Sequence, residues 1–204
     1  AVKPLPPEYS KFYGLVNASL HYDKNAVENL SRTIQSNPTD YDSILLRAEV
    51  QIERGHYKMA LHDLLSLPDD LRTDKVFVLI GECYAWMGKL QKTLDALRFV
   101  SPNYEDSSLY LCHFIVARDH CDYEEAMNCI KKAVCLNPSF NLLTIAGDYF
   151  YSNACFVEAA SFYQMALENR RNSPSVLRSL AFALIHSGEE LEGSKILKNI
   201  RKLP

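Results

Sequence analysis

The stretch Asp122–Pro138, DYEEAMNCIKKAVCLNP, shows most clearly how the chain is built. Its apolar residues recur at the three- and four-residue spacing of one face of an α-helix. They are Tyr123, Ala126, Met127, Ile130, Ala133 and Val134. The Asn137-Pro138 pair closes the pattern, since proline does not continue a helix. The stretch therefore predicts one amphipathic helix with a defined end.

This helix is one copy of a repeated pattern. Counterparts of Ala126 recur at successive offsets of 34, 33, 33, 33 and 34 residues, at Ala26, Ala60, Thr93, Ala126, Ala159 and Gly193. A second register, mostly of small residues, has the same offsets twelve positions earlier, at Gly14, Ala48, Gly81, Phe114, Gly147 and Ala181. A third falls at the expected turns, at His21, Gly55, Gly88, Cys121, Ala154 and Gly188. A fixed period in this range indicates stacked structural repeats.

Each period predicts a helix, a short turn and a second helix. Gly55, Gly88 and Gly188 supply the positive φ that ends the first helix of their units. One such pair cannot bury both of its faces, whereas a stack can. We expect a proline-rich, extended lead-in over 1–7 and a single solenoid over 8–204, with units at approximately 7–40, 41–73, 74–106, 107–139, 140–173 and 174–204.

Two prolines interrupt this plan. Pro68 and Pro102 fall where the second helices of the second and third units should continue. Because proline lacks the backbone donor and clashes with the preceding turn, we expect both helices to be short.

Composition narrows the function classes. The chain has 204 residues, of which 48% are apolar, so it can bury a substantial core. Its net charge of -3 lacks the basic excess typical of nucleic-acid-binding proteins. No apolar run approaches the roughly 20 residues of a membrane span. We therefore expect a cytoplasmic or nuclear protein. The chain begins without Met, so we also expect it to be part of a longer protein.

The six cysteines include no Cys-x-x-Cys pair, and five of them lie between 112 and 155 within helical patterns. Reduced, packed thiols fit this arrangement better than a disulfide framework does.

No catalytic or cofactor motif is found. Glycine-rich phosphate loops, nucleophile elbows and His-Glu-x-x-His patterns are absent from the sequence. The best metal candidate combines Cys112-His113 with His120-Cys121, but zinc sites place the ligands of each pair two to four residues apart. We expect these residues to occupy core and helix-end positions. We therefore predict no enzyme activity, no cofactor and no metal.

Taken together, these features resemble the tetratricopeptide repeat (TPR). The resemblance rests on the small residues of the first helix, the turn glycine, an aromatic residue such as Tyr57, Tyr123 or Phe156, an alanine three positions later, and a closing proline at Pro38 or Pro138. It covers roughly residues 8 to 203, in about six units. Phe114, Thr93 and Gly193 depart from the usual residue at their positions. The resemblance implies an all-α, right-handed superhelical solenoid of antiparallel helix pairs whose function is protein binding.

In that family the first helix of each unit lines a concave groove. Projected at 100° per residue, one face of each first helix carries the candidate partner-binding residues. They are Leu45, Glu49, Ile52, Glu53, Val78, Glu82, Trp86, Leu111, Ile115, Arg118, Asp119, Asp148 and Tyr151. Glu49, Glu82 and Asp148 recur at one register and predict an acidic stripe beside apolar patches. Such a groove would suit a peptide or helix with apolar and basic residues.

Some family members hold the acidic C-terminal tail of the Hsp70 and Hsp90 chaperones in a clamp of lysines, asparagines and an arginine. Lys11 occupies a clamp-like place, but Leu15 and Leu79 stand where an asparagine and the arginine are expected. A groove with Glu49 and Glu82 would also repel a carboxylate tail. We therefore reject this ligand class.

Two alternatives remain. The last unit has no further capping helix, so Leu191, Leu197, Ile200 and Leu203 predict an assembly surface for a second copy or a larger complex. More distantly, pentatricopeptide repeats share the plan and bind RNA, but with a positively charged groove. The sequence thus favours a protein partner over nucleic acid or membrane.

Overall fold

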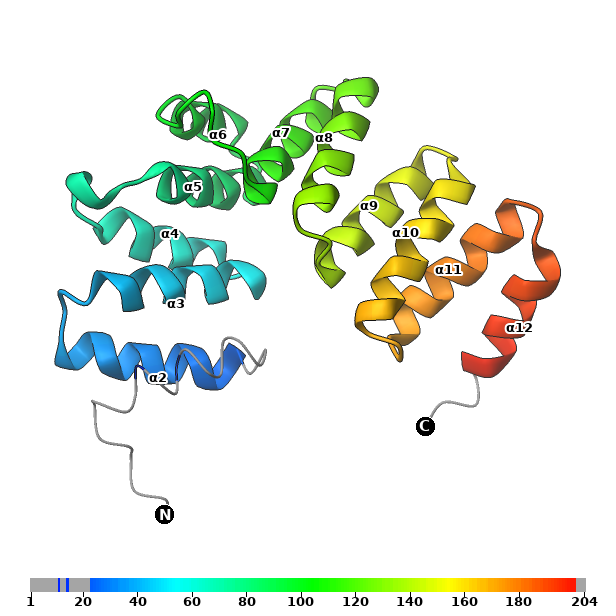
Figure 1. The fold of residues 1–204 in the computed structure, drawn as a ribbon, viewed down its shortest axis with the longest axis horizontal. Helices are drawn as coiled ribbons and strands as arrows, with labels where there is room; N and C mark the ends of the chain where they lie inside the picture. Colours follow the sequence, from blue (N-terminus) through cyan, green and yellow to red (C-terminus); the bar gives the residue numbers. More distant parts are fainter. Residues whose placement is uncertain (1–10, 12–13, 15–22, 201–204) are drawn as a thin grey trace, which may run out of the picture. The chain divides into compact units, whose positions relative to one another are not determined.

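The computed structural model describes residues 11, 14 and 23–200, and every regular element within them is helical (Figure 1). The chain divides into two compact units, residues 1–104 and 105–204. That these form one continuous right-handed solenoid over 8–204 stays a prediction. The lead-in predicted at 1–7 lies outside the described residues.

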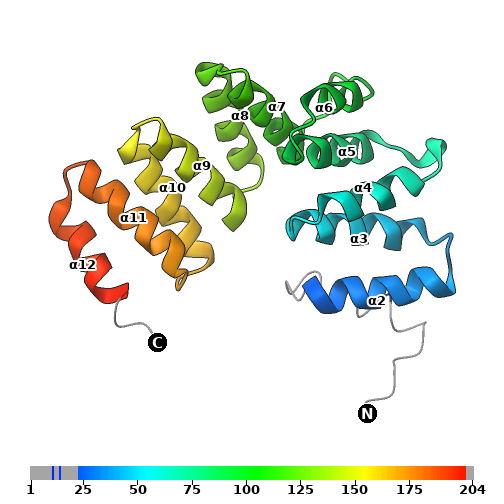
Figure 2. The ribbon, with the colours of Figure 1, turned by 180° about the vertical axis from the view of Figure 1, so that it is seen from behind.

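Unit 1 consists of short helices that pack in chain order (Figure 2). They are α2 (Asp23–Ser36), α3 (Tyr41–Glu53), α4 (Tyr57–Ser66), the 3-10 turn η1 (Asp69–Leu71), α5 (Asp74–Trp86) and α6 (Leu90–Leu97). Small and aliphatic side chains fill the space between them. Ala48 and Ala60 are fully buried, and Leu64, Val76 and Ile80 pack against them.

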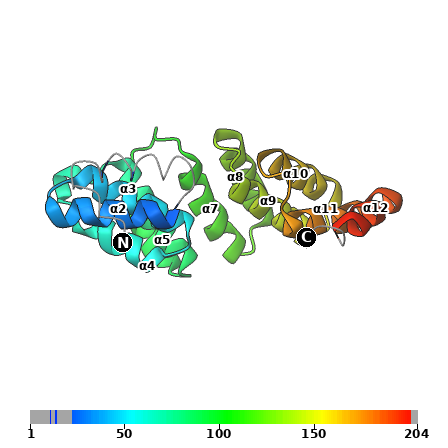
Figure 3. The ribbon, with the colours of Figure 1, turned by 90° about the horizontal axis from the view of Figure 1, so that it is seen from below.

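Unit 2 is built in the same way. Its helices are α7 (Ser107–Asp119), α8 (Tyr123–Leu136), α9 (Phe140–Ser152), α10 (Phe156–Asn169), α11 (Pro174–His186) and α12 (Glu190–Ile200). Consecutive helices lie side by side from α9 to α12 (Figures 1 and 3). The helix α8 covers most of the stretch from which the repeat was read. The helices α3, α5, α7, α9 and α11 begin at Tyr41, Asp74, Ser107, Phe140 and Pro174.

Polar side chains define several helix starts. The carboxylate of Asp40 accepts a hydrogen bond from the Ser43 amide at 3.2 Å and begins α3. Asp122 does the same for the Glu125 amide at 3.1 Å at the start of α8. Each satisfies one of the amides that the first turn of a helix leaves without a partner.

The five described turns that join the two helices of a pair each contain one residue in the left-handed backbone conformation. Gly55, Gly88 and Gly188 have φ of 74°, 69° and 99°, which confirms the predicted role of these glycines. Cys121 and Ala154 occupy the same register with φ of 59° and 60° although they carry a Cβ. Repeat geometry therefore imposes the left-handed turn whether or not glycine is present. His21 lies outside the described residues.

Small residues bring paired helices close together. A Cβ on Gly193 of α12 would lie 2.5 Å from the backbone oxygen of Ala181 in α11. A Cβ on Gly147 of α9 would lie 2.5 Å from Cε1 of Tyr163 in α10. Neither position has room for a side chain without a shift of its neighbours.

The predicted shortening of two helices is confirmed. The helix α4 ends at Ser66, and Leu67 is already extended, with ψ of 136°, before Pro68. The helix α6 ends at Leu97, and turns follow it up to Pro102. By contrast α8 and α10 each have 14 residues.

All six cysteines are free thiols, as expected, but they are not all packed. Cys121 and Cys135 are exposed. Burial, together with the nearby Glu82 carboxylate, raises the pKa of Cys83 to about 12. Burial and a hydrogen bond to Glu125 likewise raise the pKa of Cys129 to about 12. These two thiols stay protonated, and hence unreactive, at neutral pH.

Among the residues that the structure describes, no helix is both long enough and apolar enough to cross a membrane.

Candidate functional site

The predicted groove residues of unit 1 lie on α3 and α5, but burial divides them. Val78 is only 1% exposed, and Ile52 and Glu82 are also buried. Leu45, Glu49 and Trp86 are half-buried, and Glu53 is exposed. Val78 and Ile52 therefore act as core between helices, because their side chains are removed from solvent. The accessible lining on this surface is correspondingly narrower than the helical projection indicates.

The acidic stripe predicted for unit 1 is largely neutralised within the unit. The Glu49 carboxylate on α3 forms an ion pair with Lys75 on α5. Glu82 lies one repeat period after Glu49 and is only 6% exposed. Its charge contributes to raising the pKa of Tyr57, after the larger effect of burial. Of these two carboxylates, one is thus paired with an internal cation and the other is removed from solvent.

Trp86 packs against the neighbouring helix. Its ring stacks on Tyr57 of α4, with centroids 6.0 Å apart and planes 13° apart. This contact fixes the end of α5 against the beginning of α4. The exposed edge of Trp86 is consequently a rigid apolar feature at one end of the surface.

The predicted residues of α7 separate in the same way. Leu111 and Ile115 are buried, at 8% and 0% exposure, so they belong to the core. Arg118 and Asp119 are exposed, and the guanidinium donates two hydrogen bonds to Oδ1 of its neighbour at 3.0 and 2.8 Å. Their charges are therefore paired with each other.

A different surface is found on α9 to α11 in unit 2. Here the side chains surround a surface pocket of about 240 Å³. Its lining comprises Asp148, Tyr151, Ser152, Tyr163, Ser179 and Phe182. Two of these, Asp148 and Tyr151, are predicted groove residues, so the structure brings them together with residues from two further helices.

Tyr163 reaches the pocket across α9. Its ring passes over Gly147, and its hydroxyl donates a 2.7 Å hydrogen bond to Oδ1 of Asp148. Burial and the bond to this carboxylate raise the pKa of Tyr163 well above its usual value. The phenol therefore remains a donor, and Asp148 remains the acceptor.

Tyr151 is held by residues of α11 and α10. Its hydroxyl lies 3.0 Å from Nδ1 of His186, and the two rings stack with centroids 5.6 Å apart. The ring of Phe156 contacts that of Tyr151 edge-on, with centroids 5.3 Å apart. Phe182 of α11 adds a side chain that is 42% exposed. The pocket therefore has fixed aromatic rings beside a carboxylate.

The sequence reasoning missed Tyr163, Ser179, Phe182 and His186. Phe182 lies 34 residues after Asp148, and His186 lies 34 after Ser152, so the repeat register could have extended the groove into the sixth unit. Tyr163 occupies the register of Leu64 and Ile130, where these other units carry an aliphatic core residue. Only its packing against Gly147 places its hydroxyl beside the Asp148 carboxylate.

The residues of the metal candidate differ in exposure. Cys112 is buried, whereas His113, His120 and Cys121 are exposed. Within the described ranges, no group of three or more His, Cys, Asp or Glu side chains is arranged to hold a metal ion.

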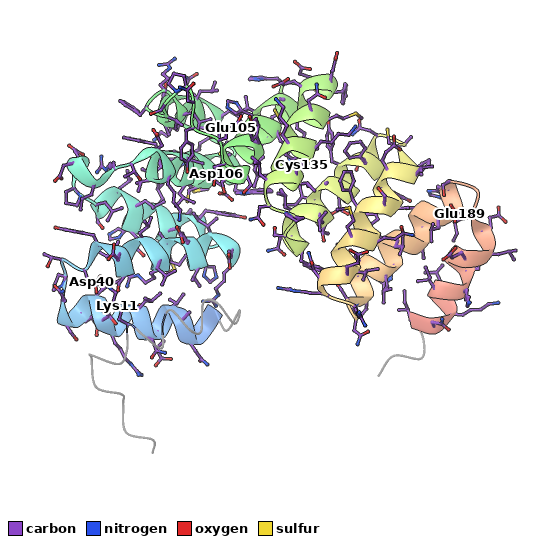
Figure 4. All side chains as sticks on the ribbon, in the orientation of Figure 1. Lys11, Asp40, Glu105, Asp106, Cys135 and Glu189 are labelled. Atoms are coloured by element: carbon purple, nitrogen blue, oxygen red, sulfur yellow. The ribbon has the colours of Figure 1, made fainter. Side chains whose placement is uncertain are left out.

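The predicted assembly surface lies on α12. Leu191 is 91% exposed, and Leu197 and Ile200 are half-buried. Leu203 lies outside the described residues. At the other end of the described chain, Lys11 donates a 2.9 Å hydrogen bond to Asp40 (Figure 4). This pair positions Lys11 against the start of α3 and engages its charge.

Comparisons with known proteins agree with this architecture. Residues 19–100 match the family described as anaphase-promoting complex, cyclosome, subunit 3, over less than half of the chain. No curated protein matches the sequence.

Solved structures match nearly the whole chain. A thermophilic TPR protein of Thermus thermophilus is similar at a TM-score of 0.67 and 20% identity, covering 88% of this chain and 100% of that one. The APC/C heterotetramer Cut9–Hcn1 contains a chain similar at a TM-score of 0.68 and 15% identity, covering 95% of this chain and 42% of that one. Pseudomonas aeruginosa pilF is similar at a TM-score of 0.63 and 15% identity, covering 96% of this chain and 90% of that one. At these identities the likeness concerns the fold.

Proposed function

We propose that this chain, which has the all-α tetratricopeptide-repeat fold, is a non-catalytic protein-binding scaffold or adaptor. Its partner would supply an extended or helical segment with apolar and basic residues. The observation that carries the proposal is the pocket on α9 to α11, where the exposed Phe182 and the half-buried Tyr151 lie beside the carboxylate of Asp148. Repeat proteins use such surfaces of side chains on rigid helices for peptide recognition.

The comparisons support a role in assembly. The family matched over 19–100 is described as a subunit of the anaphase-promoting complex, and the Cut9–Hcn1 structure is a heterotetramer. Both are multiprotein assemblies. A chain of the same fold with accessible apolar side chains is suited to a similar kind of association, with a partner of its own.

The pocket residues meet the ordinary requirements of a binding site. Phe182 is an exposed aromatic side chain, and Tyr151 is held in one orientation by His186 and Phe156. A pre-oriented aromatic residue loses little side-chain entropy when a ligand binds. Aromatic residues of this kind are enriched among those that carry most of the binding energy at interfaces.

The test is a selection of displayed peptides on the immobilised 204-residue chain, with Phe182→Ala as the counter-selection target. Phe182 is exposed, so its truncation should remove ligand contacts and leave the fold unchanged. We expect the enriched peptides to bind Phe182→Ala at least about tenfold more weakly. Val157→Ala is the matched control, since it truncates an apolar side chain of α10 that is 68% exposed and lies outside the pocket lining.

Peptides that bind both variants as well as the wild type would place recognition elsewhere and would reject this surface. A selection that enriches no peptide sensitive to Phe182→Ala would do the same. Circular dichroism of each variant checks that helicity is retained.

The second candidate is a structural subunit that associates through α12. The specific observation is Leu191, which is 91% exposed on a helix whose other apolar residues are half-buried. Together with the half-buried Ile196, Leu197 and Ile200, it gives α12 accessible apolar surface that a further element would cover.

Light scattering coupled to size exclusion tests this candidate. A monomer has a mass of 23.2 kDa. Self-association through α12 predicts a concentration-dependent dimer that Leu191→Asp converts to monomer. A dimer that persists in Leu191→Asp, or a monomer at every concentration, would reject it. RNA binding is the most distant alternative, and the net charge of -3 disfavours it.

A further inference from the structure

We infer that the pocket on α9 to α11 takes the positively charged side chain of an arginine or lysine in the bound segment. This inference rests on the proposed function and specifies which part of the partner the pocket recognises. Four features of the described residues support it: an unpaired carboxylate, a fixed orientation of that carboxylate, aromatic walls, and an opening to solvent.

Charge is the first of these features. Among the described residues, no basic nitrogen lies within 4.0 Å of an Asp148 carboxylate oxygen, and Asp148 is exposed. Three of the other predicted acidic groove residues differ. Glu49 is paired with Lys75, Asp119 is paired with Arg118, and Glu82 is buried. Asp148 therefore retains a negative charge that a ligand can use.

The hydrogen bond from Tyr163 orients this carboxylate without neutralising it. The phenol donates to Oδ1 at 2.7 Å, which leaves Oδ2 as the remaining acceptor for a ligand. Because Tyr163 is 2% exposed and packed over Gly147, its hydroxyl has a fixed position. A pre-oriented carboxylate forms a charge-assisted hydrogen bond at a lower entropic cost than a mobile one.

Aromatic rings supply the other component of a cation site. Tyr151 and Phe182 both line the pocket, and Tyr151 is fixed by His186 and Phe156. The face of an aromatic ring attracts a cation electrostatically. Aromatic rings and a carboxylate around one opening therefore favour a cation over a neutral or anionic group.

The nearby basic residues do not fill the pocket. Arg178 precedes Ser179 on α11, but it is not among the lining residues, and in the described part of the chain its side chain makes no ion pair with Asp148. His186 faces Tyr151, with its Nδ1 3.0 Å from the hydroxyl oxygen. The charge of Asp148 is thus available to a group from another molecule.

The experiment is a titration of the 15N-labelled 204-residue chain with N-acetyl-arginine amide, followed through backbone amide shifts. We expect saturable shifts at residues 148–152 and 179–186. The citrulline analogue has the same length and shape but no charge, and we expect it to bind at least about tenfold more weakly. N-acetyl-lysine amide should shift the same amides.

The matched variants separate charge from structure. In Asp148→Asn the side-chain oxygen still accepts from Tyr163, so the site keeps its shape and loses its charge. We expect arginine amide to bind this variant at least about tenfold more weakly. Glu158→Gln removes a carboxylate from an exposed position of α10 outside the pocket lining, and it should bind as the wild type does.

Equal binding of citrulline, unchanged binding to Asp148→Asn, or stronger shifts with N-acetyl-aspartate amide would each overturn the inference. The outcome is distinguishable from that of the proposed function. Selected peptides that depend on Phe182 but need no basic residue would support peptide binding and reject the cation pocket. Charge-dependent arginine binding without any Phe182-dependent peptide would support the pocket and reject the peptide-binding role.

Discussion

The surface on α3 and α5 in unit 1 and the surface on α9 and α11 in unit 2 are built from the same repeat positions, yet they differ in chemistry. Glu49 and Asp148 lie 99 residues apart, which is three repeat periods. The first forms an ion pair with Lys75, whereas the second accepts a hydrogen bond from the neutral Tyr163. Equivalent register therefore determines where a carboxylate lies, and its neighbours determine whether its charge is free.

The cores beneath the two surfaces show a complementary difference. In unit 1 the register of Arg47 and Asp63 holds an ion pair between a half-buried guanidinium and a buried carboxylate, with guanidinium donors 2.8 Å from both carboxylate oxygens. The same positions in α9 and α10 of unit 2 are Ala146 and Phe162. The α3–α4 pair thus has an ionic interaction between helices where the α9–α10 pair has apolar side chains.

The largest expected effect comes from breaking the ionic contact of unit 1. Asp63→Ala leaves the Arg47 guanidinium, which also donates to Ser31 at 3.1 Å, half-buried and without its carboxylate. Removal of one partner from a buried pair costs about 3 kcal/mol or more. We expect a loss of this size in the free energy of unfolding, measured by urea denaturation.

The control for that prediction places the apolar residues of α9 and α10 at the equivalent positions of α3 and α4. Arg47→Ala combined with Asp63→Phe reproduces Ala146 and Phe162, and it leaves no unpaired charge. We expect the double variant to be more stable than Asp63→Ala alone. If the double variant is the less stable of the two, the unpaired guanidinium is not the cause of the loss.

The next effect concerns the close contact that creates the pocket. A Cβ at residue 147 would lie 2.5 Å from the Tyr163 ring, so Gly147→Ala should force the ring to move. Overpacking of this kind costs about 1–3 kcal/mol. We expect that loss in urea denaturation, together with shifted amide signals around Asp148 as the hydrogen bond to Tyr163 is disturbed.

A second substitution should relieve the overpacking that Gly147→Ala causes. Unit 1 carries Ala48 and Leu64 at the registers of Gly147 and Tyr163, and both are fully buried. Gly147→Ala with Tyr163→Leu reproduces this pair. We expect the double variant to recover part of the stability that Gly147→Ala loses, and additive losses would contradict the proposed coupling between the two positions.

A smaller effect is expected at the turns. At this register unit 1 has Gly55 and Gly88, whereas unit 2 has Gly188 at one turn and Cys121 and Ala154, each with φ near 60°, at the other two. The left-handed conformation costs a residue with a Cβ about 1–2 kcal/mol, and glycine avoids this at some entropic cost. We expect Ala154→Gly to raise the free energy of unfolding by about 0.5–1 kcal/mol.

The reverse change in unit 1 is the control. Gly88→Ala should lower stability, although no atom lies within 4 Å of the added Cβ. The sign of the change in the free energy of unfolding would then report the effect of backbone conformation alone. A stabilising Gly88→Ala, or a destabilising Ala154→Gly, would show that another factor dominates at these turns.

The smallest effect is a pH dependence at one helix start. Asp40 and Ser139 occupy the same register and begin α3 and α9. Burial opposes ionisation of Asp40, but the hydrogen bonds from Lys11 and Ser43 outweigh it and hold the pKa of Asp40 below its usual value. A lowered pKa in the folded state contributes stability above the unfolded pKa of about 4, and this is lost as pH falls through the folded pKa.

Asp40→Ser keeps a capping oxygen and removes the charge, as in α9. Because Lys11 is 40% exposed, we expect a loss of at most about 1 kcal/mol at pH 7. The wild type and the variant should converge in thermal unfolding as pH falls below about 4. Asp42→Asn is the control, since its 92% exposed carboxylate lies 3.8 Å from Lys11 and should contribute less. A difference that is independent of pH would exclude the charge of Asp40 as its origin.

Much of the fold could be read from residue spacing. The three registers with common offsets place the helix pairs and their turns, because a helix face repeats at about 3.6 residues and a stacked unit repeats at a fixed length. The shortened helices before Pro68 and Pro102 follow from proline chemistry. The left-handed backbone of Cys121 and Ala154 was not predicted from composition, since these residue types do not demand it. Their register nonetheless indicates it.

The candidate site could be predicted only in part. Helical projection selected Asp148 and Tyr151, which line the pocket, and it also selected Val78 and Ile115, which are buried. A projection gives the direction of a side chain from its own helix but contains no information on what covers it. Burial depends on the neighbouring helix, and the neighbour differs from one unit to the next.

Sequence alone therefore established the repeat, the helix-turn-helix unit and the register at which acidic residues recur, because each depends on local spacing and backbone preference. The identity of the accessible carboxylate came from packing in three dimensions. Glu49 on α3 contacts Lys75 on α5, the first helix of the following repeat. Asp148 instead contacts Tyr163, whose ring packs over Gly147. Those contacts join residues that are far apart in sequence and lie on different helices, and only the close approach of the helices determines which side chains meet.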